Sequence, residues 1–315
     1  MALFPLGILS AAGAGGIVIA PLAGYFAGGW NGTVQYTTVD RYAFPSDTRT
    51  TLGTGVSSPG HTAGCGFANS LIAGYSAGGF DSGSGSRTEI DRILFATDVI
   101  SILSATLATF KAGLAGFANS AVAGYLAGGI TTVRVNTIEK LVFPAETIST
   151  LGTTLSATTF FYAGSFANSG TAGYVGGGDS SGFHSTVDKI AFPGDTRSTL
   201  GTGLSSPTGY LTGMANSGVA GYFAGGNGPI STVDKFAFPG DSRSTLGTGL
   251  SSGRAFPAGM AHSGTAGYVG GGNDGVNRMT TVDKFAFPSD TRSTLGSGLS
   301  IARDRGTAMA SSGAL

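Results

Sequence analysis

Short stretches in which apolar and polar residues alternate recur along the whole chain. In TVDKFAF at 232–238, Val, Lys and Ala alternate with Asp, Phe and Phe, which is the period of two expected for a pleated strand. Proline follows this type of stretch five times, at Pro45, Pro144, Pro193, Pro239 and Pro288. Because proline cannot donate to a sheet ladder, each strand is expected to end there.

The pattern repeats with a nearly constant period. A Gly-Tyr pair marks each repeat, and successive tyrosines are 50, 50, 49, 48 and 46 residues apart. These tyrosines are Tyr25, Tyr75, Tyr125, Tyr174, Tyr222 and Tyr268. Each unit contains four apolar stretches, typified by GFANS, AGYFAGG, TVDKFAF and STLGTGL. Four strands at this period are typical of one blade of a β-propeller.

The two ends of the chain predict how the blades close into a ring. The final TAMASSGAL matches the first strand of a unit, around Met309, and the Gly-Tyr strand due after it stands instead at 23–29. The sequence therefore predicts an all-β protein, a six-bladed β-propeller over residues 21–315 with four strands per blade. N-terminal strands complete the blade that the C-terminal strand begins, which removes free sheet edges.

Composition agrees with this fold class. Glycine accounts for 56 of 315 residues, and Tyr and Phe for 10 and 20, a mixture typical of short aromatic strands joined by glycine-rich turns. The 17 basic and 17 acidic residues cancel, so no nucleic-acid partner is expected. The single cysteine, Cys65, occupies a position that holds small residues in other units, which favours packing near the axis.

Comparison of the six units separates two faces of the ring. The spacing from the third-strand acid to the fourth-strand leucine is always 12, and that from the first-strand Asn or His to the second-strand Tyr is always 6. Because strands alternate in direction, these turns share one face, the uniform face. The other two connections vary in length and sequence and form the variable face. Binding residues are usually carried on loops of a rigid scaffold, so the variable face is the predicted binding face.

The variable face carries the most distinctive side chains. An exposed indole at Trp30 can stack on a sugar or anchor a protein contact, and a structural role is the alternative. The links between blades add further aromatic and basic residues. The candidate ligand- or partner-binding residues are Trp30, Phe161, Tyr162, Tyr210, Arg254 and Phe256.

The charged and metal-binding residue types favour structural roles. The acids of the third strands recur in every unit, which indicates a structural ladder. A second set of acids, in SDTR-type turns such as that of Asp195 and Asp241, is expected to initiate turns that the neighbouring arginine covers. The three histidines match no metal spacing: His61, His184 and His262. We expect no enzyme activity, no cofactor and no metal site.

Calcium binding by individual loops is left open. Asp81, Asp179 and Asp274 have Asn and Ser neighbours and carry the oxygen ligands that calcium prefers. Ordinary turn chemistry explains the same residues equally well.

The repeat resembles the kelch repeat. Its second strand ends in a diglycine, and Arg254 and Arg303 stand where kelch units often carry an arginine before the next inner strand. The diglycines of the resemblance are Gly28–Gly29, Gly78–Gly79, Gly128–Gly129 and Gly225–Gly226. Leucine replaces the usual kelch tryptophan in every unit. The resemblance covers about residues 20–315 and implies the propeller fold, whereas propellers as a class perform many functions.

Residues 1–20 belong to no blade and form a separate segment. The stretch lacks the basic region of a secretory signal, and Pro5 and several glycines interrupt it as a membrane span, so neither is expected. Its apolar strip is too short to fold alone, and docking on a partner would bury it: Phe4, Leu6, Ile8 and Leu9. Ala11–Gly16 would then act as a flexible tether.

The opening MALFPLGILSAAGAGG resembles that of predicted virion proteins of marine bacteriophages, including cyanophages. The near-identical units, such as TVDKFAFPSDTRSTLGSGLS at 281–300, are similar to phage and marine bacterial repeat proteins. The resemblance implies a non-enzymatic structural protein of a virion, a tail or capsid appendage. Its partners would be other virion proteins, through the N-terminal strip, and a host glycan or receptor, and a symmetric oligomer on the particle is compatible with it. The alternative is a secreted or cell-surface adhesin or matrix protein of a marine bacterium.

Overall fold

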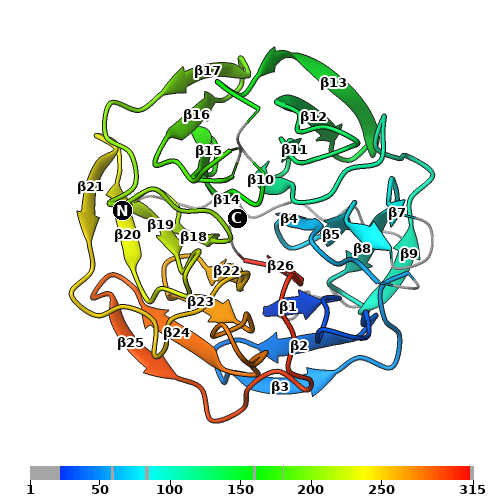
Figure 1. The fold of residues 1–315 in the computed structure, drawn as a ribbon. Helices are drawn as coiled ribbons and strands as arrows, with labels where there is room; N and C mark the ends of the chain where they lie inside the picture. Colours follow the sequence, from blue (N-terminus) through cyan, green and yellow to red (C-terminus); the bar gives the residue numbers. More distant parts are fainter. Residues whose placement is uncertain (1–21, 58–59, 82–84, 159–160, 180, 313–315) are drawn as a thin grey trace, which may run out of the picture.

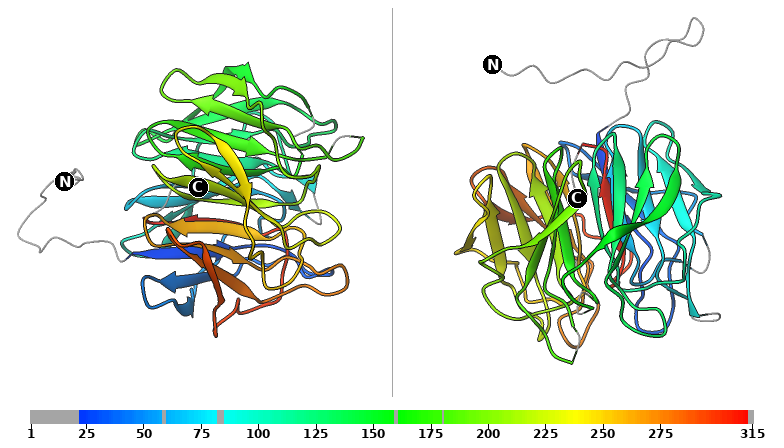
Figure 2. Two further views of the ribbon diagram at one scale, coloured as in Figure 1. Left: turned by 90° about the vertical axis from the view of Figure 1, so that its left-hand side faces the viewer. Right: turned by 90° about the horizontal axis from the view of Figure 1, so that it is seen from above.

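The computed structural model describes residues 22–57, 60–81, 85–158, 161–179 and 181–312. Within these ranges the chain forms six four-stranded antiparallel sheets, arranged as blades around a central axis (Figure 1). Seen edge-on, the ring is a short cylinder whose strands run roughly along its axis (Figure 2). The predicted all-β, six-bladed propeller is confirmed. Over the described ranges, none of the secondary structure amounts to an apolar helix of membrane-spanning length.

The two inner strands of each blade are almost completely buried. The innermost strands pack against one another in a closed ring around the axis. They are β26 (Thr307–Ala310), β4 (Cys65–Asn69), β10 (Ala115–Asn119), β14 (Gly164–Asn168), β18 (Thr212–Asn216) and β22 (Ala258–His262). The second strands are β1 (Ala23–Ala27), β5 (Ala73–Ala77), β11 (Ala123–Ala127), β15 (Ala172–Gly176), β19 (Ala220–Ala224) and β23 (Ala266–Gly270).

The two outer strands become progressively more exposed. The third strands are β2 (Val39–Ala43), β8 (Ile90–Leu94), β12 (Thr137–Val142), β16 (Val187–Ala191), β20 (Val233–Ala237) and β24 (Val282–Ala286). The fourth are β3 (Thr48–Thr51), β9 (Val99–Ile102), β13 (Thr147–Thr154), β17 (Thr196–Thr199), β21 (Ser242–Thr245) and β25 (Thr291–Thr294). A short hairpin of β6 (Phe80–Asp81) and β7 (Gly85–Ser86) extends from the second blade on the variable face.

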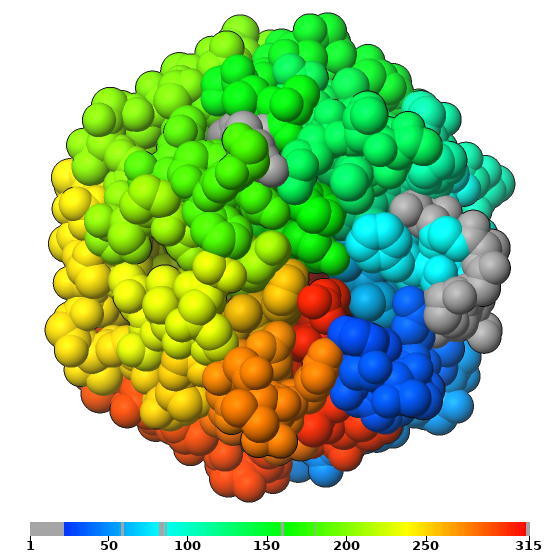
Figure 3. Space-filling model, viewed as in Figure 1, coloured from blue at the N-terminus to red at the C-terminus, as the bar shows by residue number. Residues whose placement is uncertain are grey.

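The ring closes through the split first blade, as predicted. Strand β26 pairs antiparallel with β1, with Met309 opposite Tyr25. The blades follow one another around the centre in chain order, so that the C-terminal strand lies beside the first strands of the chain (Figure 3). The innermost position of every blade is thus occupied by a paired strand.

Five of the six fourth strands lie earlier in the sequence than predicted, whereas β13 covers TISTLGTT and so contains most of the predicted stretch. STLGTGL was expected to form this strand, but β21 covers SRST at Ser242–Thr245 and ends before Leu246. The following segment leaves the sheet, because Gly249 passes so close to the Ser231 carbonyl that a Cβ there would lie 2.2 Å from its oxygen. Leu250 is then buried between blades. The apolar pattern in this segment therefore reflects packing between blades and not strand pairing.

The tyrosine of each Gly-Tyr pair packs on a phenylalanine across every blade boundary, and this phenylalanine belongs to a Phe-Pro pair in five of the six blades. The tyrosine of each second strand stacks on the phenylalanine that ends the third strand of the next blade, as in Tyr75–Phe143 and Tyr174–Phe238, with ring centroids 5.3 and 5.5 Å apart. The same pairing closes the ring between Tyr268 and Phe44. The repeated tyrosine and phenylalanine of the sequence thus form the same contact between blades six times.

The acids of the SDTR-type turns complete this interface on the uniform face. Asp241 has a left-handed backbone, with φ of 53°, as do its equivalents. Its carboxylate accepts hydrogen bonds from the Tyr174 hydroxyl at 2.7 Å and from Lys189 Nζ at 2.6 Å, both in the preceding blade. All six boundaries carry this clamp of a tyrosine, a basic residue and an acid. The predicted turn is present, but its carboxylate connects blades.

Candidate binding site on the variable face

Six equivalent residues, each just before an inner strand, form a ring around the axis at the variable face. All have a left-handed backbone, with φ between 54° and 65°: Ala63, Gly113, Tyr162, Tyr210, Phe256 and Arg305. The N–H of each donates to the carbonyl of its equivalent in the preceding blade, and the bond from Ala63 to Arg305 closes the circle. Left-handed residues other than glycine are strained, and this closed ring of hydrogen bonds supports them.

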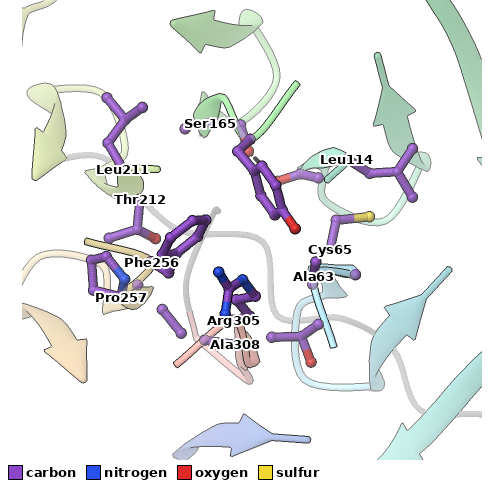
Figure 4. Close-up of a pocket in the computed structure, with 18 of the residues that line it drawn as sticks. Ala63, Cys65, Leu114, Ser165, Leu211, Thr212, Phe256, Pro257, Arg305 and Ala308 are labelled. Atoms are coloured by element: carbon purple, nitrogen blue, oxygen red, sulfur yellow. Dashed lines mark hydrogen bonds between the residues drawn. The ribbon is translucent and has the colours of Figure 1, made fainter. Parts of the chain in front are cut away.

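The side chains of this ring are unequal in size. Four large ones come from four consecutive blades, whereas blades two and three contribute only Ala63 and Gly113. Tyr210 stacks on Phe256 with centroids 4.2 Å apart, and Tyr162 lies edge-on to both rings. The Arg305 guanidinium lies over Phe256, 4.0 Å from the ring centroid. It occupies the middle of the opening that the ring encloses at this end of the axis, which we call the mouth (Figure 4).

Further aromatic and arginine side chains extend this group outward. Phe161 lies 4.2 Å from Tyr162, between centroids, and Arg134 covers Phe161 at 5.5 Å. Phe183 meets Tyr210 edge-on. On the other side, the Trp30 ring lies under Arg305. We call this group, whose members are all half-buried, the axial cluster: Trp30, Arg134, Phe161, Tyr162, Phe183, Tyr210, Phe256, Arg278 and Arg305.

Trp30 is held by both its backbone and its ring. Its N–H donates to the Asp304 carbonyl and its carbonyl accepts from the Asp304 N–H, each at 2.9 Å. The guanidinium groups of Arg278 and Arg305 lie 4.7 and 5.1 Å from the ring centroid. The Asp304 carboxylate lies 3.2 Å from Arg278 and 3.1 Å from Arg305. Trp30 therefore has a packing role and remains half-exposed on the surface.

Arg254 lies apart from the axial cluster. Its side chain is 0% exposed, and its Nη2 donates to Asp283 Oδ2 at 2.6 Å. Burial lowers its pKa, and Asp283 opposes this effect. Because no surface of Arg254 is accessible, its position fits a contact between blades and not a contact with a ligand.

Each third-strand acid bonds across a blade boundary, as Asp283 does with Arg254. These buried carboxylates are Asp40, Asp91, Glu139, Asp188, Asp234 and Asp283. Each accepts hydrogen bonds from the link that leaves the preceding blade. Residues equivalent to Arg254 supply a basic partner at three other boundaries: His61, Lys111 and Arg303. The structural ladder expected from the sequence is thus a set of bonds between blades.

A small cavity of about 90 Å³ lies at the axis beneath the ring. Its lining includes Tyr162, Thr212, Arg305 and Cys65 (Figure 4). Burial raises the pKa of Tyr162 to about 12, against the opposing effect of Arg305. Burial likewise raises the pKa of the Cys65 thiol to about 12. Both groups are therefore neutral at physiological pH, and among the described residues of the lining Arg305 is the one charged side chain.

Other candidate sites named from the sequence are dispersed. His61 bonds Asp91, whereas His262 stacks on Phe44 and has a pKa lowered by burial and by Lys284. In the described part of the chain, no three His, Cys, Asp or Glu side chains are grouped closely enough to hold a metal ion.

The three loop aspartates considered for calcium lie in different blades. The carboxylate of Asp274 accepts the N–H groups of Val276 and Asn277, so turn chemistry explains it. These backbone hydrogen bonds lower its pKa. Asp179 pairs with Arg134. The N-terminal strip of Phe4, Leu6, Ile8 and Leu9 lies outside the described residues.

Sequence reasoning missed four members of the axial cluster: Arg134, Phe183, Arg278 and Arg305. Arg305 stands in the same link as Arg303, and alternation alone does not show which of the two points inward. A column of the six aligned units would have placed Arg305 with Tyr162, Tyr210 and Phe256. Arg134, Phe183 and Arg278 each stand five residues before the acid of the third strand, so a second column, counted back from that acid, would have aligned them.

Fold and site together define a six-bladed β-propeller with an aromatic and arginine cluster over one mouth of its axis. No family model matches the chain, and a search of the curated proteins also found no match.

Proposed function

We propose that this chain is a non-enzymatic binding protein, in which the propeller is a rigid scaffold and the axial cluster is the contact surface. The observation that carries the proposal is the concentration of half-exposed Trp, Tyr, Phe and Arg side chains on one face. These residue types dominate the anchors of binding interfaces. The uniform face, in contrast, presents repeated turns whose acids are already bonded to tyrosine and basic side chains of the preceding blade.

We further propose that the protein is a kelch-like appendage of a phage virion, on the tail or capsid, which contacts a host glycan or another virion protein. The positive φ of both glycines in pairs such as Gly28–Gly29 supports the kelch-like repeat. Strand β1 starts at the uniform face, where Leu22 is 37% exposed. A partner bound to residues 1–20 would thus hold the propeller from the face opposite the axial cluster.

The binding surface is tested with the double variant Trp30→Ala/Tyr210→Ala in the full chain. Alanine fits the left-handed backbone of position 210, because Ala63 occupies the equivalent position with φ of 60°. We expect binding to host cells or purified particles to weaken by about 1–3 kcal/mol, the scale of interface anchors. The matched control is Arg197→Ala/Arg243→Ala on the fourth strands. Equal loss in both double variants, or no loss in either, would contradict the proposed surface.

The virion assignment is tested by mass spectrometry of purified particles. Detection of the protein in stoichiometric amount supports an appendage, and its loss on removal of residues 1–20 supports attachment through that segment. The alternative adhesin of a marine bacterium predicts the protein on the cell surface or in the medium instead.

A further inference from the structure

We propose that the axial mouth of the variable face binds the carboxylate of an acidic saccharide, with Arg305 as its counter-ion. The proposal rests on the proposed function, since it names the ligand class of the same surface. It is argued from the charge balance, the shape of the mouth and the surrounding side chains.

The charges around Arg305 do not balance. Asp304 is 1% exposed, and its single carboxylate lies within 3.2 Å of two guanidinium groups, those of Arg278 and Arg305. The group of three therefore keeps one positive charge. Arg134, the other arginine of the axial cluster, has its own partner in Asp179. Since the Arg305 side chain is 21% accessible, the surplus charge reaches solvent at the mouth.

The mouth is open on one side of Arg305. Ala63 contributes only a methyl group to the ring, so blade two leaves room there, whereas the Phe161 ring fills the space at Gly113 of blade three, 2.3 Å from where a Cβ would stand. The cavity of about 90 Å³ holds roughly three waters at liquid density, about 30 Å³ each. This volume admits a carboxylate and the edge of a sugar, whereas the sugar ring itself would lie on the surface outside.

The surroundings favour a saccharide over a polyanion. The Phe256 ring lies between Tyr210 and Arg305, so the half-exposed side chains of Tyr210 and Trp30 supply the apolar surface for the C–H groups of a sugar. A nucleic acid or a strongly acidic peptide requires a row of cations, and the axial cluster with its acidic partners has only one surplus positive charge among the described residues. Exposed Asp274 on the same face repels a polyanion, whereas its carboxylate can accept a hydrogen bond from a sugar hydroxyl.

The test uses the full-length protein and matched sugars that differ only in the carboxyl group. Isothermal titration compares oligogalacturonate with its methyl ester, and sialyllactose with its methyl ester. We expect at least one acidic sugar to bind, with affinity at least tenfold above that of its neutral partner and falling as salt is added. Equal affinity for both members of each pair, or no binding by either acid, overturns the inference.

Variants at Arg305 provide the second part of this test. Arg305→Ala should reduce acid binding at least tenfold and leave the neutral sugar unaffected, while Arg305→Lys should recover part of it. Ala63 occupies the equivalent left-handed position, so Arg305→Ala is compatible with the fold, and an unchanged melting temperature confirms this. Arg243→Ala, on the outer strand β21, is the control. If Arg305→Ala leaves acid binding unchanged while Trp30→Ala/Tyr210→Ala abolishes attachment, the proposed function stands and the inference falls.

Discussion

At the scale of single residues, one acidic residue per blade with a left-handed backbone both closes a turn and bonds the preceding blade. Asp241 illustrates both, because its backbone closes the turn between β20 and β21 while its carboxylate binds Tyr174 and Lys189 of the preceding blade. Aspartate suits this position because it tolerates the left-handed region better than most residues. The clamp also explains why the tyrosine, the lysine and the aspartate recur together.

Replacing Asp241 with Asn tests how much the negative charge of its carboxylate contributes to stability. Asn keeps the size and the left-handed tolerance of Asp but leaves Lys189 without its carboxylate. We expect a loss of about 1–3 kcal/mol in the free energy of unfolding, the range for hydrogen bonds to charged groups, measured by urea denaturation. A double-mutant cycle with Lys189→Met provides the control, and strictly additive losses would show that the pair is not coupled.

At the scale of elements, the diglycines let the end of each second strand pack directly against the link that leads to the next blade. Gly177 has φ of 69°, and a Cβ there would lie 2.4 Å from the Thr208 carbonyl oxygen. The following Gly178 N–H donates to that same oxygen at 2.8 Å. The backbone itself therefore fills the contact, which leaves no space for a side chain.

Gly177→Ala is expected to destabilise the protein by at least about 2 kcal/mol, since the left-handed backbone and the close contact each add a penalty. Gly247→Ala is the matched control, because it lies in an exposed turn with nothing within 4 Å of its Cβ. That variant should change stability by less than about 1 kcal/mol. Thermal melts compare the two, and similar melting temperatures would show that the contact is not tight.

Elements also show what the sequence alone could and could not predict. Strand number and ring closure followed from the spacing of Gly-Tyr pairs, because each unit repeats one interface. Five of the six fourth strands were placed too late in the sequence, because the apolar residues of segments such as LGTGL pack between blades and not in the sheet. Arg254 was named as a candidate binding residue and Arg305 was not, although Arg305 is the equivalent of Phe256, which stands only two positions after Arg254. Only coordinates show that Arg254 points into the boundary and Arg305 toward the axis.

At the scale of the whole molecule, six boundary tyrosines share one response to pH. Burial, reinforced by the neighbouring acid, raises the hydroxyl pKa of each: Tyr25, Tyr75, Tyr125, Tyr174, Tyr222 and Tyr268. A pKa raised in the folded state gives stability that is complete below the unfolded value, about 10, and is lost as pH rises above it. The ring as a whole should therefore weaken in alkali.

We expect the melting temperature to fall steeply from about pH 10 upward, because the unfolded chain releases these protons more readily. Melts from pH 8 to about pH 11.5 measure the effect, and tyrosine absorbance reports ionisation in parallel. Tyr174→Phe should make the decline shallower by removing one of the six titrating groups. A melting temperature that stays level up to pH 11 would mean that the hydroxyls ionise without unfolding.

The split first blade places the two ends of the described chain next to each other. The Ser311 N–H donates to the Ala23 carbonyl and its hydroxyl accepts from the Ala23 N–H, so a short peptide would join them. Since every boundary has the same clamp, a circularly permuted gene, reopened in a loop of another blade, would encode the same ring. A cargo domain fused at either end would project from one side only, leaving the opposite mouth unobstructed.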